Sequence, residues 1–344
     1  MKKYVVIGLI LLIAAGGLIY SQLKTNAQPN EKMVLGYTTS EESSFHSLKE
    51  YHEYLTAIAM DTYSFDTDGK LSGEAPENQL EYAKQHDIDT YAVISNFGKA
   101  DFDPDLAHAV MSDKDAKSSF IGQLVQLTAE DDFTGVNIDF EAVYPEDRDL
   151  YSDFIKDVAG ELKEHDIQTM VSVPAKDIDD PTDDWSWPYN YEKIGAYADY
   201  VQVMTYDEHG SWSEPGSVAS LDWMNKMLAF ATETINPNKV IMGVPAYGYD
   251  WNLSNPEENT LMEWDSIHSK IADNDIDPIY EEGTASTYFN FAEENQEHIV
   301  WFEDERSLQK KTSLTNTYSM TGVSVYALGH ESESFWKAIG AGIK

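Results

Sequence analysis

Apolar runs of strand length recur along the chain, and each is followed by turn or acidic residues and then by a segment with helical periodicity. In one of these segments, apolar residues recur every four positions, as on the buried face of a helix: Leu150, Phe154, Val158 and Leu162. Eight strands that alternate with helices predict a parallel (β/α)8 (TIM) barrel of the α/β class. The eight runs begin at Met33, Tyr54, Asp89, Phe133, Ile167, Tyr197, Lys239 and Gly322.

The spacing breaks once, between the seventh and eighth runs. Residues from about 252 to 303 are too many for an ordinary strand-to-helix loop, and they contain strand-like pieces of their own, STYFNF and HIVWF. We therefore expect a small α+β insertion on the rim of the barrel, between its strands seven and eight.

The N-terminus predicts export. Lys2 and Lys3 precede an uncharged apolar stretch from Tyr4 to Tyr20, whose 17 residues are long for a signal peptide core and short for a membrane span. Cleavage after Ala27 and retention as a membrane anchor both remain open, and either places the rest of the chain outside the cytoplasm. We thus divide the chain into a signal peptide or anchor plus polar linker (1–32) and a barrel (33–344).

Charge and composition narrow the class of partner. The chain carries 61 acidic residues against 23 Lys and Arg, a formal charge of −38, which argues against nucleic acid as a partner. It has no cysteine, which excludes disulfides, thiolate zinc sites and a cysteine nucleophile. We expect a monomer without a cofactor or a metal. His209 and His330 both follow predicted strands, but two histidines do not make a metal site.

The fourth run, FTGVNIDFE, carries the chemistry. Because side chains alternate along a strand, Asn137, Asp139 and Glu141 share the face that points into the barrel. Glu141 comes last and should lie at the mouth, where active sites of such barrels are found. Polar groups in an enclosed space are costly unless they pair or act. This pattern predicts a catalytic acid, Glu141, supported by a carboxylate and an amide.

Three segments resemble glycoside hydrolase family 18. FTGVNIDFE is similar to that family's strand-four signature, roughly D-G-x-D-x-D-x-E; VMTYDEHG (203–210) is similar to its strand-six M-x-Y-D motif, and VPAYGYDW (244–251) to its strand-seven pattern. The resemblance runs from Met33 to the C-terminus. It is strongest to bacterial peptidoglycan N-acetylglucosaminidases of spore cortex and germination, on account of SFDTDG, VNIDFE, TYDEHGSW and VWFED.

The resemblance implies roles for individual residues. Glu141 would be the general acid and base, and Asp139 would orient the acetamido group of the substrate. Tyr206 and Asp207 would contact the same group, and Met204 would line the subsite of the reacting sugar. Trp212 and Trp251, in loops after strands six and seven, are candidate sugar-stacking surfaces.

The sequence departs from the family pattern at several positions. Thr134 and Phe140 replace residues that we expect to lie away from the chemistry. Asn137 replaces the deepest inward Asp of the signature, so we expect Asp139 to have no like-charged neighbour on its strand and to stay ionised. Tyr326 stands where the family often has Trp, and we expect it to form the floor under the reacting sugar, with less stacking area.

These observations predict an exported, retaining glycosidase that cleaves β-linked N-acetylglucosamine glycans by substrate-assisted catalysis. Peptidoglycan is favoured over chitin as the substrate. A catalytically silent carbohydrate-binding barrel and a structural envelope protein remain as alternatives, because a fold does not determine a function.

Overall fold

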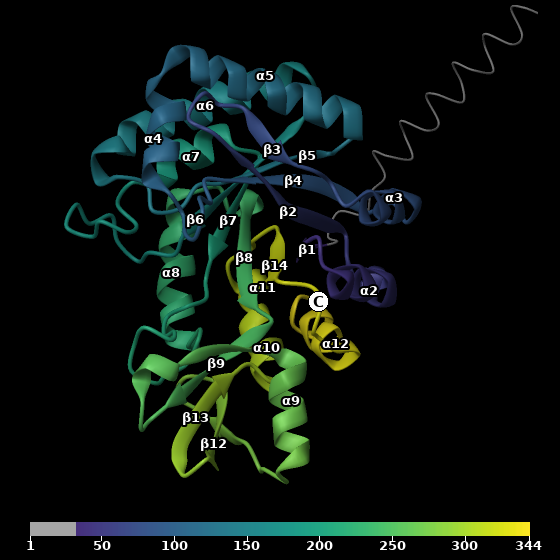
Figure 1. Cartoon of the computed structure of the whole chain (residues 1–344), viewed down its shortest axis with the longest axis vertical. Coiled ribbons are helices and arrows are strands. Elements are labelled where there is room, and N and C mark those ends of the chain that lie inside the picture. The colour runs from purple at the N-terminus through teal and green to yellow at the C-terminus, as the bar shows by residue number, and fades with distance from the viewer. Residues whose placement is uncertain (1–31) are drawn as a thin grey trace, which may run out of the picture. The chain divides into compact units, whose positions relative to one another are not determined.

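The computed structural model describes residues 32–344, and its core is a closed barrel of eight parallel strands (Figure 1). In spatial order the strands run β1-β14-β8-β7-β6-β5-β4-β2, and pairing of β1 with β2 closes the ring. The (β/α)8 prediction is confirmed. The strands are β1 (Met33–Thr38), β2 (Ala57–Phe65), β4 (Asp89–Ser95), β5 (Gly135–Asp139), β6 (Gln168–Pro174), β7 (Tyr200–Met204), β8 (Val240–Pro245) and β14 (Gly322–Tyr326).

Helices surround the barrel (Figure 1). The helix expected from apolar spacing is α6 (Arg148–Glu164), which buries Phe154, Val158 and Leu162 against the strands. The other helices are α2 (Glu42–Tyr51), α3 (Glu77–Gln85), α4 (Pro104–Ser112), α5 (Lys114–Asp131), α7 (Tyr191–Tyr197), α8 (Leu221–Thr234), α10 (Glu305–Thr312), α11 (Leu314–Thr317) and α12 (Glu333–Gly342). Short 3-10 turns lie at His52–Tyr54, Pro145–Asp147, Pro237–Lys239 and Pro256–Glu258, and β3 (Leu71–Gly73) pairs antiparallel with β2.

Alternation along each strand separates two layers of core. Outward side chains such as Val136 and Ile138 pack with the helices in the main hydrophobic core. Inward side chains fill the barrel itself in a smaller cluster that includes Leu35, Tyr91 and Ile241. The polar residues of β5 take inward positions in the same alternation, so the hydrophobic core holds the strand that presents them.

The insertion between barrel strands seven and eight is a five-stranded antiparallel sheet with one helix (Figure 1). It begins at Tyr247 rather than near 252, because the run from Lys239 to Trp251 contains two strands that separate at Ala246. Both strands are buried throughout, so their apolar pattern shows no break. The elements are β9 (Tyr247–Asn252), β10 (Thr260–Glu263), α9 (Trp264–Asp273), β11 (Ile279–Glu281), β12 (Ser286–Glu293) and β13 (Gln296–Phe302).

The predicted signal peptide or anchor lies outside the described residues. Between residues 32 and 344, no helix is both long enough and apolar enough to cross a bilayer.

Candidate active site

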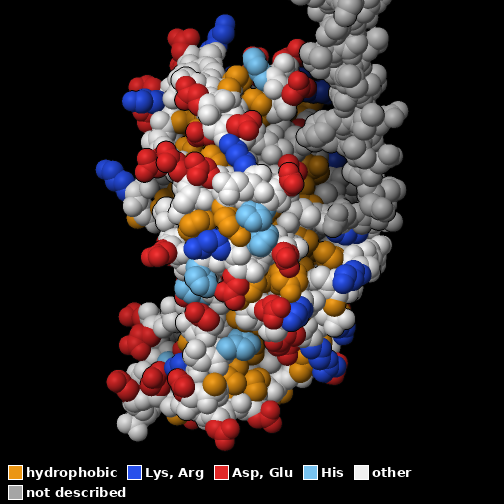
Figure 2. Space-filling view, turned by 90° about the vertical axis from the view of Figure 1, so that its right-hand side faces the viewer, with side chains coloured by type: hydrophobic (Ala, Val, Ile, Leu, Met, Phe, Trp, Pro, Cys, Tyr) orange, Lys and Arg blue, Asp and Glu red, His pale blue; other side chains and the backbone are white. Residues whose placement is uncertain are grey.

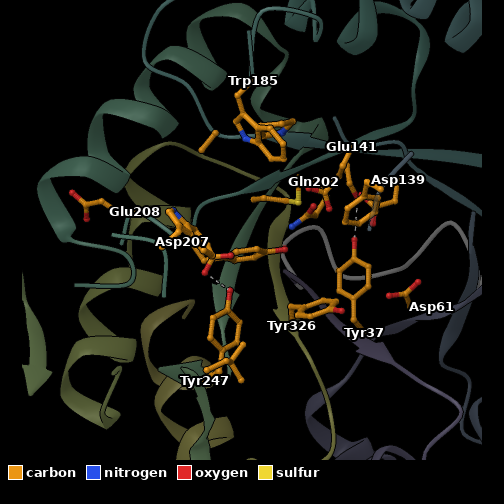
Figure 3. Close-up of a pocket in the computed structure, with 18 of the residues that line it drawn as sticks. Tyr37, Asp61, Asp139, Glu141, Trp185, Gln202, Asp207, Glu208, Tyr247 and Tyr326 are labelled. Atoms are coloured by element: carbon orange, nitrogen blue, oxygen red, sulfur yellow. Dashed lines mark hydrogen bonds between the residues drawn. The ribbon is translucent and has the colours of Figure 1, made fainter. Parts of the chain in front are cut away.

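A cavity of about 760 Å³ opens at the carboxyl ends of the barrel strands (Figure 3). It contains seven of the nine residues that the sequence predicted for the site: Asp139, Glu141, Met204, Tyr206, Asp207, Trp212 and Tyr326. Asn137 and Trp251 are not among the residues that line it. The chain therefore brings strands four, six and eight of the barrel together around one space, as the motifs predicted.

Asn137 lies beneath the cavity rather than in it. Its side chain is fully buried, its Oδ1 accepts a hydrogen bond of 2.6 Å from the Tyr37 hydroxyl, and its Nδ2 donates one of 3.0 Å to Ser172 Oγ. The prediction that Asn137 binds substrate is thus wrong. An amide at this depth must satisfy its polar atoms within the protein, and here it ties β5 to β1 and β6.

The backbone of Glu141 is held from β4. Its N–H donates to Asn96 Oδ1 at 2.8 Å, and Asn96 Nδ2 donates back to the Glu141 carbonyl, also at 2.8 Å. The Tyr189 hydroxyl donates to the Phe140 carbonyl at 2.8 Å. These bonds fix the chain just beyond the end of β5, so the Glu141 side chain projects into the cavity from a rigid support. The sequence analysis missed Asn96, although a polar residue directly after the apolar run AVIS was a usable signal.

Burial raises the pKa of the two carboxyl groups at the end of β5, Asp139 and Glu141. It raises the pKa of Asp139 to about 7, and the negative charge of Asp61 adds to the shift. Burial also raises the pKa of Glu141 well above its ordinary value, reinforced by Asp139. The expectation that Asp139 stays ionised is therefore wrong, because the pattern of one strand shows neither the burial of this carboxyl group nor the charge of Asp61 on another strand. Asp139 Oδ1 is buried without a hydrogen-bond partner among the described residues.

Asp207 is held by the insertion. Its backbone takes a left-handed conformation (φ 65°), which turns the side chain after β7. Its Oδ1 accepts hydrogen bonds from the hydroxyls of Tyr247 at 2.8 Å and Tyr249 at 3.0 Å, both on β9 (the Tyr247 bond is visible in Figure 3). These two bonds lower the pKa of Asp207, while burial raises it more. The motif VPAYGYDW contained both tyrosines, but only the insertion sheet gives them this role.

Aromatic side chains line the outer part of the cavity. Trp212 is 69 % exposed and Trp185, which the sequence analysis missed, is 52 % exposed. Trp251 is only 1 % exposed, and its indole N–H donates to the carbonyls of Gly210 and Ser213. The prediction that Trp251 stacks on a sugar is wrong, because it lies on β9 in the core of the insertion rather than in a loop.

One cluster has the composition of a metal site but lies apart from the cavity. Within residues 32–344, Glu263, Asp265 and His330 bring possible ligand atoms within 4.8 Å of one another. The imidazole contacts both carboxylates at 3.3 Å, and the two acids are exposed. Ion pairing at the surface accounts for this arrangement, and we assign it no ligand. His209 is not part of the cluster.

A parallel barrel whose mouth holds two carboxyl groups of raised pKa beside exposed tryptophans has the features of a glycosidase site. Residues 33–331 match the family described as Glycosyl hydrolases family 18, and the chain belongs to that family. The resemblance found in the motifs is confirmed, and the protein is a glycosidase.

Relatives and solved structures agree with this assignment. The chain is 50 % identical to the "Uncharacterized glycosylase YvbX" of Bacillus subtilis (strain 168), over 100 % of both chains. It is 26 % identical to the "Cortical fragment-lytic enzyme" of Bacillus anthracis, covering 87 % of this chain and 70 % of that one. The crystal structure of a chitinase from Chromobacterium violaceum ATCC 12472 superposes with a TM-score of 0.87 at 35 % identity, covering 91 % of this chain and 99 % of the other.

Proposed function

We propose that this protein hydrolyses β-linked N-acetylglucosamine glycans, with peptidoglycan favoured over chitin, and that the configuration of the reacting sugar is retained. The observation that carries the proposal is a pair of carboxyl groups at the end of β5: Glu141 at the mouth, with a raised pKa, and below it Asp139 with an unpartnered oxygen. A cortical fragment-lytic enzyme among the relatives supports peptidoglycan, and a chitinase among the similar structures keeps chitin as the second substrate.

The geometry supports substrate-assisted catalysis. Most glycosidases use two protein carboxylates, but in some families the acetamido group of the substrate is the nucleophile. Glu141 gives its proton to the leaving oxygen while the acetamido carbonyl attacks the anomeric carbon. Asp139 accepts a hydrogen bond from the acetamido N–H and, in its ionised form, stabilises the positive charge of the oxazolinium ring, while Tyr206 donates to the acetamido oxygen. Water that loses a proton to Glu141 then opens the ring.

Two measurements test this function. Mass spectrometry of products from purified peptidoglycan and from chitin oligomers should show cleavage on the reducing side of N-acetylglucosamine, with peptidoglycan turned over faster. Proton NMR of the first product should show the β anomer, because two inversions at the same carbon retain configuration.

A substrate variant tests the nucleophile. If the acetamido carbonyl attacks, oligomers with plain glucosamine at the reacting position should not be cut, although their positive charge suits this acidic protein. A thiazoline analogue of N-acetylglucosamine should inhibit, because it resembles the cyclic intermediate. Efficient cleavage of the glucosamine link would contradict the mechanism.

We also propose that the protein is exported. The support is the apolar stretch from Tyr4 to Tyr20 after two lysines, which lies outside the described residues. Cell fractionation and mass spectrometry of the mature N-terminus would distinguish a membrane anchor from a cleaved signal peptide. Recovery of the full-length chain in the cytoplasm would contradict export.

A further inference from the structure

Asp61 is a carboxylate of the cavity that none of the motifs includes. It lies on β2, half-buried, and lines the same space as Asp139 and Glu141. Figure 3 shows it beside Tyr37 and Tyr326, at the foot of the cavity. Placing a half-buried carboxylate near two other carboxyl groups lowers the stability of the fold. Such an arrangement points to a role in the function of the site.

The barrel places Asp61 level with Asp139. Asp61 is in register with Val93 of β4, and Val93 is in register with Asn137 of β5. Neighbouring strands of such a barrel are staggered by about one residue each, and alternate strands contribute to one layer. The position on β5 at the height of Asp61 is therefore about two residues beyond Asn137, which is Asp139.

Tyr326 favours the charged form of Asp61 and offsets part of the effect of burial. Met204 of β7 and Tyr326 of β14 come from the remaining alternate strands, so they complete the layer that contains Asp61 and Asp139. Tyr326 hydrogen-bonds to Asp61 and lowers the pKa of that carboxyl group, which burial otherwise raises. Asp139 receives no such bond from Tyr326, and its pKa is raised to about 7. The negative charge of Asp61 opposes the ionisation of Asp139.

The negative charge of Asp61 is informative because this chain lacks the negative charge that the family signature has at position 137. The family signature has an Asp where this chain has Asn137, and that Asp would lie one inward position below Asp139. In this protein the neighbouring charge comes from a different strand. The titratable groups around Asp139 are Tyr37 of β1, Asp61 of β2, Glu141 after β5, Tyr151 of α6, Tyr189 before α7, Tyr206 after β7 and Tyr326 of β14.

We propose that Asp61 is a positioning residue of the catalytic array: its carboxylate, held by Tyr326, keeps the proton on Asp139 and so replaces the charge that Asn137 lacks. The inference rests on the proposed role of Asp139 toward the acetamido group. A protonated Asp139 can share its proton with Glu141 in the free enzyme, and its unpartnered oxygen stays available to the substrate.

The test measures the titration midpoint, and so the pKa, of the Asp139 carboxyl group directly. Carboxyl carbon NMR of protein labelled at aspartate, with the signal assigned through Asp139→Asn, gives the titration midpoint without any turnover. Asp61→Asn should lower that midpoint by about one unit or more, since a like charge is removed. The control is Asp68→Asn, which removes the same formal charge from an exposed turn on the same chain segment and should leave the midpoint in place.

A charge exchange separates the electrostatic role from a structural one. Asn137→Asp should raise the midpoint of Asp139, and the double variant Asp61→Asn/Asn137→Asp should return it toward the wild-type value. The acidic limb of the kcat/KM profile on an N-acetylglucosamine oligomer should move in the same direction as the midpoint in each variant. A residue needed only for packing would not be rescued by a charge on another strand.

The outcomes distinguish this inference from the proposed function. An unchanged midpoint in folded Asp61→Asn would overturn the inference alone. If Asp61→Asn fails to fold, Asn137→Asp and Tyr326→Phe still decide it. Asn137→Asp should raise the midpoint. Tyr326→Phe should lower it, because Asp61 without its hydrogen bond keeps its own proton to higher pH and opposes the ionisation of Asp139 less. A midpoint that moves in neither variant would overturn the inference. Full activity of Asp139→Asn would instead overturn the proposed function.

Discussion

At the scale of single residues, the active site depends on protons held by burial. Asp139 is the last residue of β5 and Glu141 follows two residues later, and burial raises the pKa of both. A general acid works best when its pKa lies near the working pH, which an exposed carboxyl group cannot achieve. The two hydrogen bonds between the Asn96 side chain and the Glu141 backbone fix the position from which the Glu141 carboxyl group projects.

Glu141→Gln should abolish turnover without unfolding the protein. Because general acid and base catalysis each contribute about 10²–10⁴ in rate and this residue serves both steps, we expect at least the lower of these losses in kcat. The measurement is oligomer hydrolysis, with circular dichroism for the fold and calorimetry for retained glycan binding. Exposed Glu146→Gln is the matched control. Residual activity above a tenth of wild type would contradict the assignment.

Asp139→Asn should stabilise the fold at alkaline pH. The folded-state pKa of about 7 lies above the ordinary value of 3.8, so Asp139 contributes stability that is complete below about pH 4 and is lost as pH rises through 7. Above pH 8 the variant should be more stable than wild type, by an amount on the order of 4 kcal/mol. Thermal unfolding at pH 4 and pH 8 measures this, and an equal difference at both pH values would show that Asp139 does not titrate as described.

At the scale of elements, the insertion contributes directly to the candidate active site, because its residues contact a residue that lines the cavity. Strand β9 supplies Tyr247 and Tyr249 to Asp207, so the insertion sheet sets the position of a cavity residue after β7. The insertion is in turn joined to the barrel by a buried ion pair. Lys311 of α10 contacts Glu303, just after β13, at 2.5 Å, and donates to Ser286 of β12 at 2.7 Å.

Lys311→Met should destabilise the protein strongly, because it leaves the Glu303 charge buried and unpaired. Removing one partner of a buried pair typically costs about 3–5 kcal/mol, and denaturant unfolding at pH 8 should show a loss of that size. Burial already raises the pKa of Glu303, so the loss should shrink at acidic pH, where the carboxyl group can protonate.

The double variant Glu303→Gln/Lys311→Met is the control for this pair. It removes both charges and should recover part of the stability, since the cost comes from the unpaired ion rather than from lost packing. A double variant less stable than Lys311→Met at pH 8 would contradict the electrostatic explanation.

At the scale of the whole molecule, the surface is strongly acidic, and we expect this charge to affect how the protein approaches a charged substrate. Figure 2 shows Asp and Glu spread over the visible face with fewer Lys and Arg between them, in keeping with the formal charge of −38. Like charges at this density oppose aggregation and also repel anionic polymers.

Activity on intact cell walls should therefore rise with moderate salt. The Debye length falls from about 10 Å at 0.1 M to about 3 Å at 1 M, which screens repulsion between the protein and anionic wall polymers. Rates on isolated walls and on a short neutral oligomer, measured across this range, form the comparison. Equal salt responses on both substrates would show that surface charge plays no part in substrate approach.

The barrel and the catalytic strand could be derived from the sequence because both depend on local periodicity. Alternation with period two placed Asp139 and Glu141 on the inward face of β5 and the apolar residues between them on the outward face. The eightfold recurrence of such strands then left few topologies to consider. The order of residues along one strand is enough for the inward face, and the recurrence of such strands along the chain is enough for the barrel.

Only the tertiary structure decided what surrounds that strand. The charge of Asp61, the Asn96 hold on Glu141 and the β9 tyrosines on Asp207 all join residues far apart in the chain. Trp251 and Asn137 were misplaced for the same reason: a tryptophan after a strand and an inward amide have no local mark that separates a cavity wall from a buried contact. Burial and pKa depend on every element packed around a group, and a one-dimensional pattern records only the group's own strand.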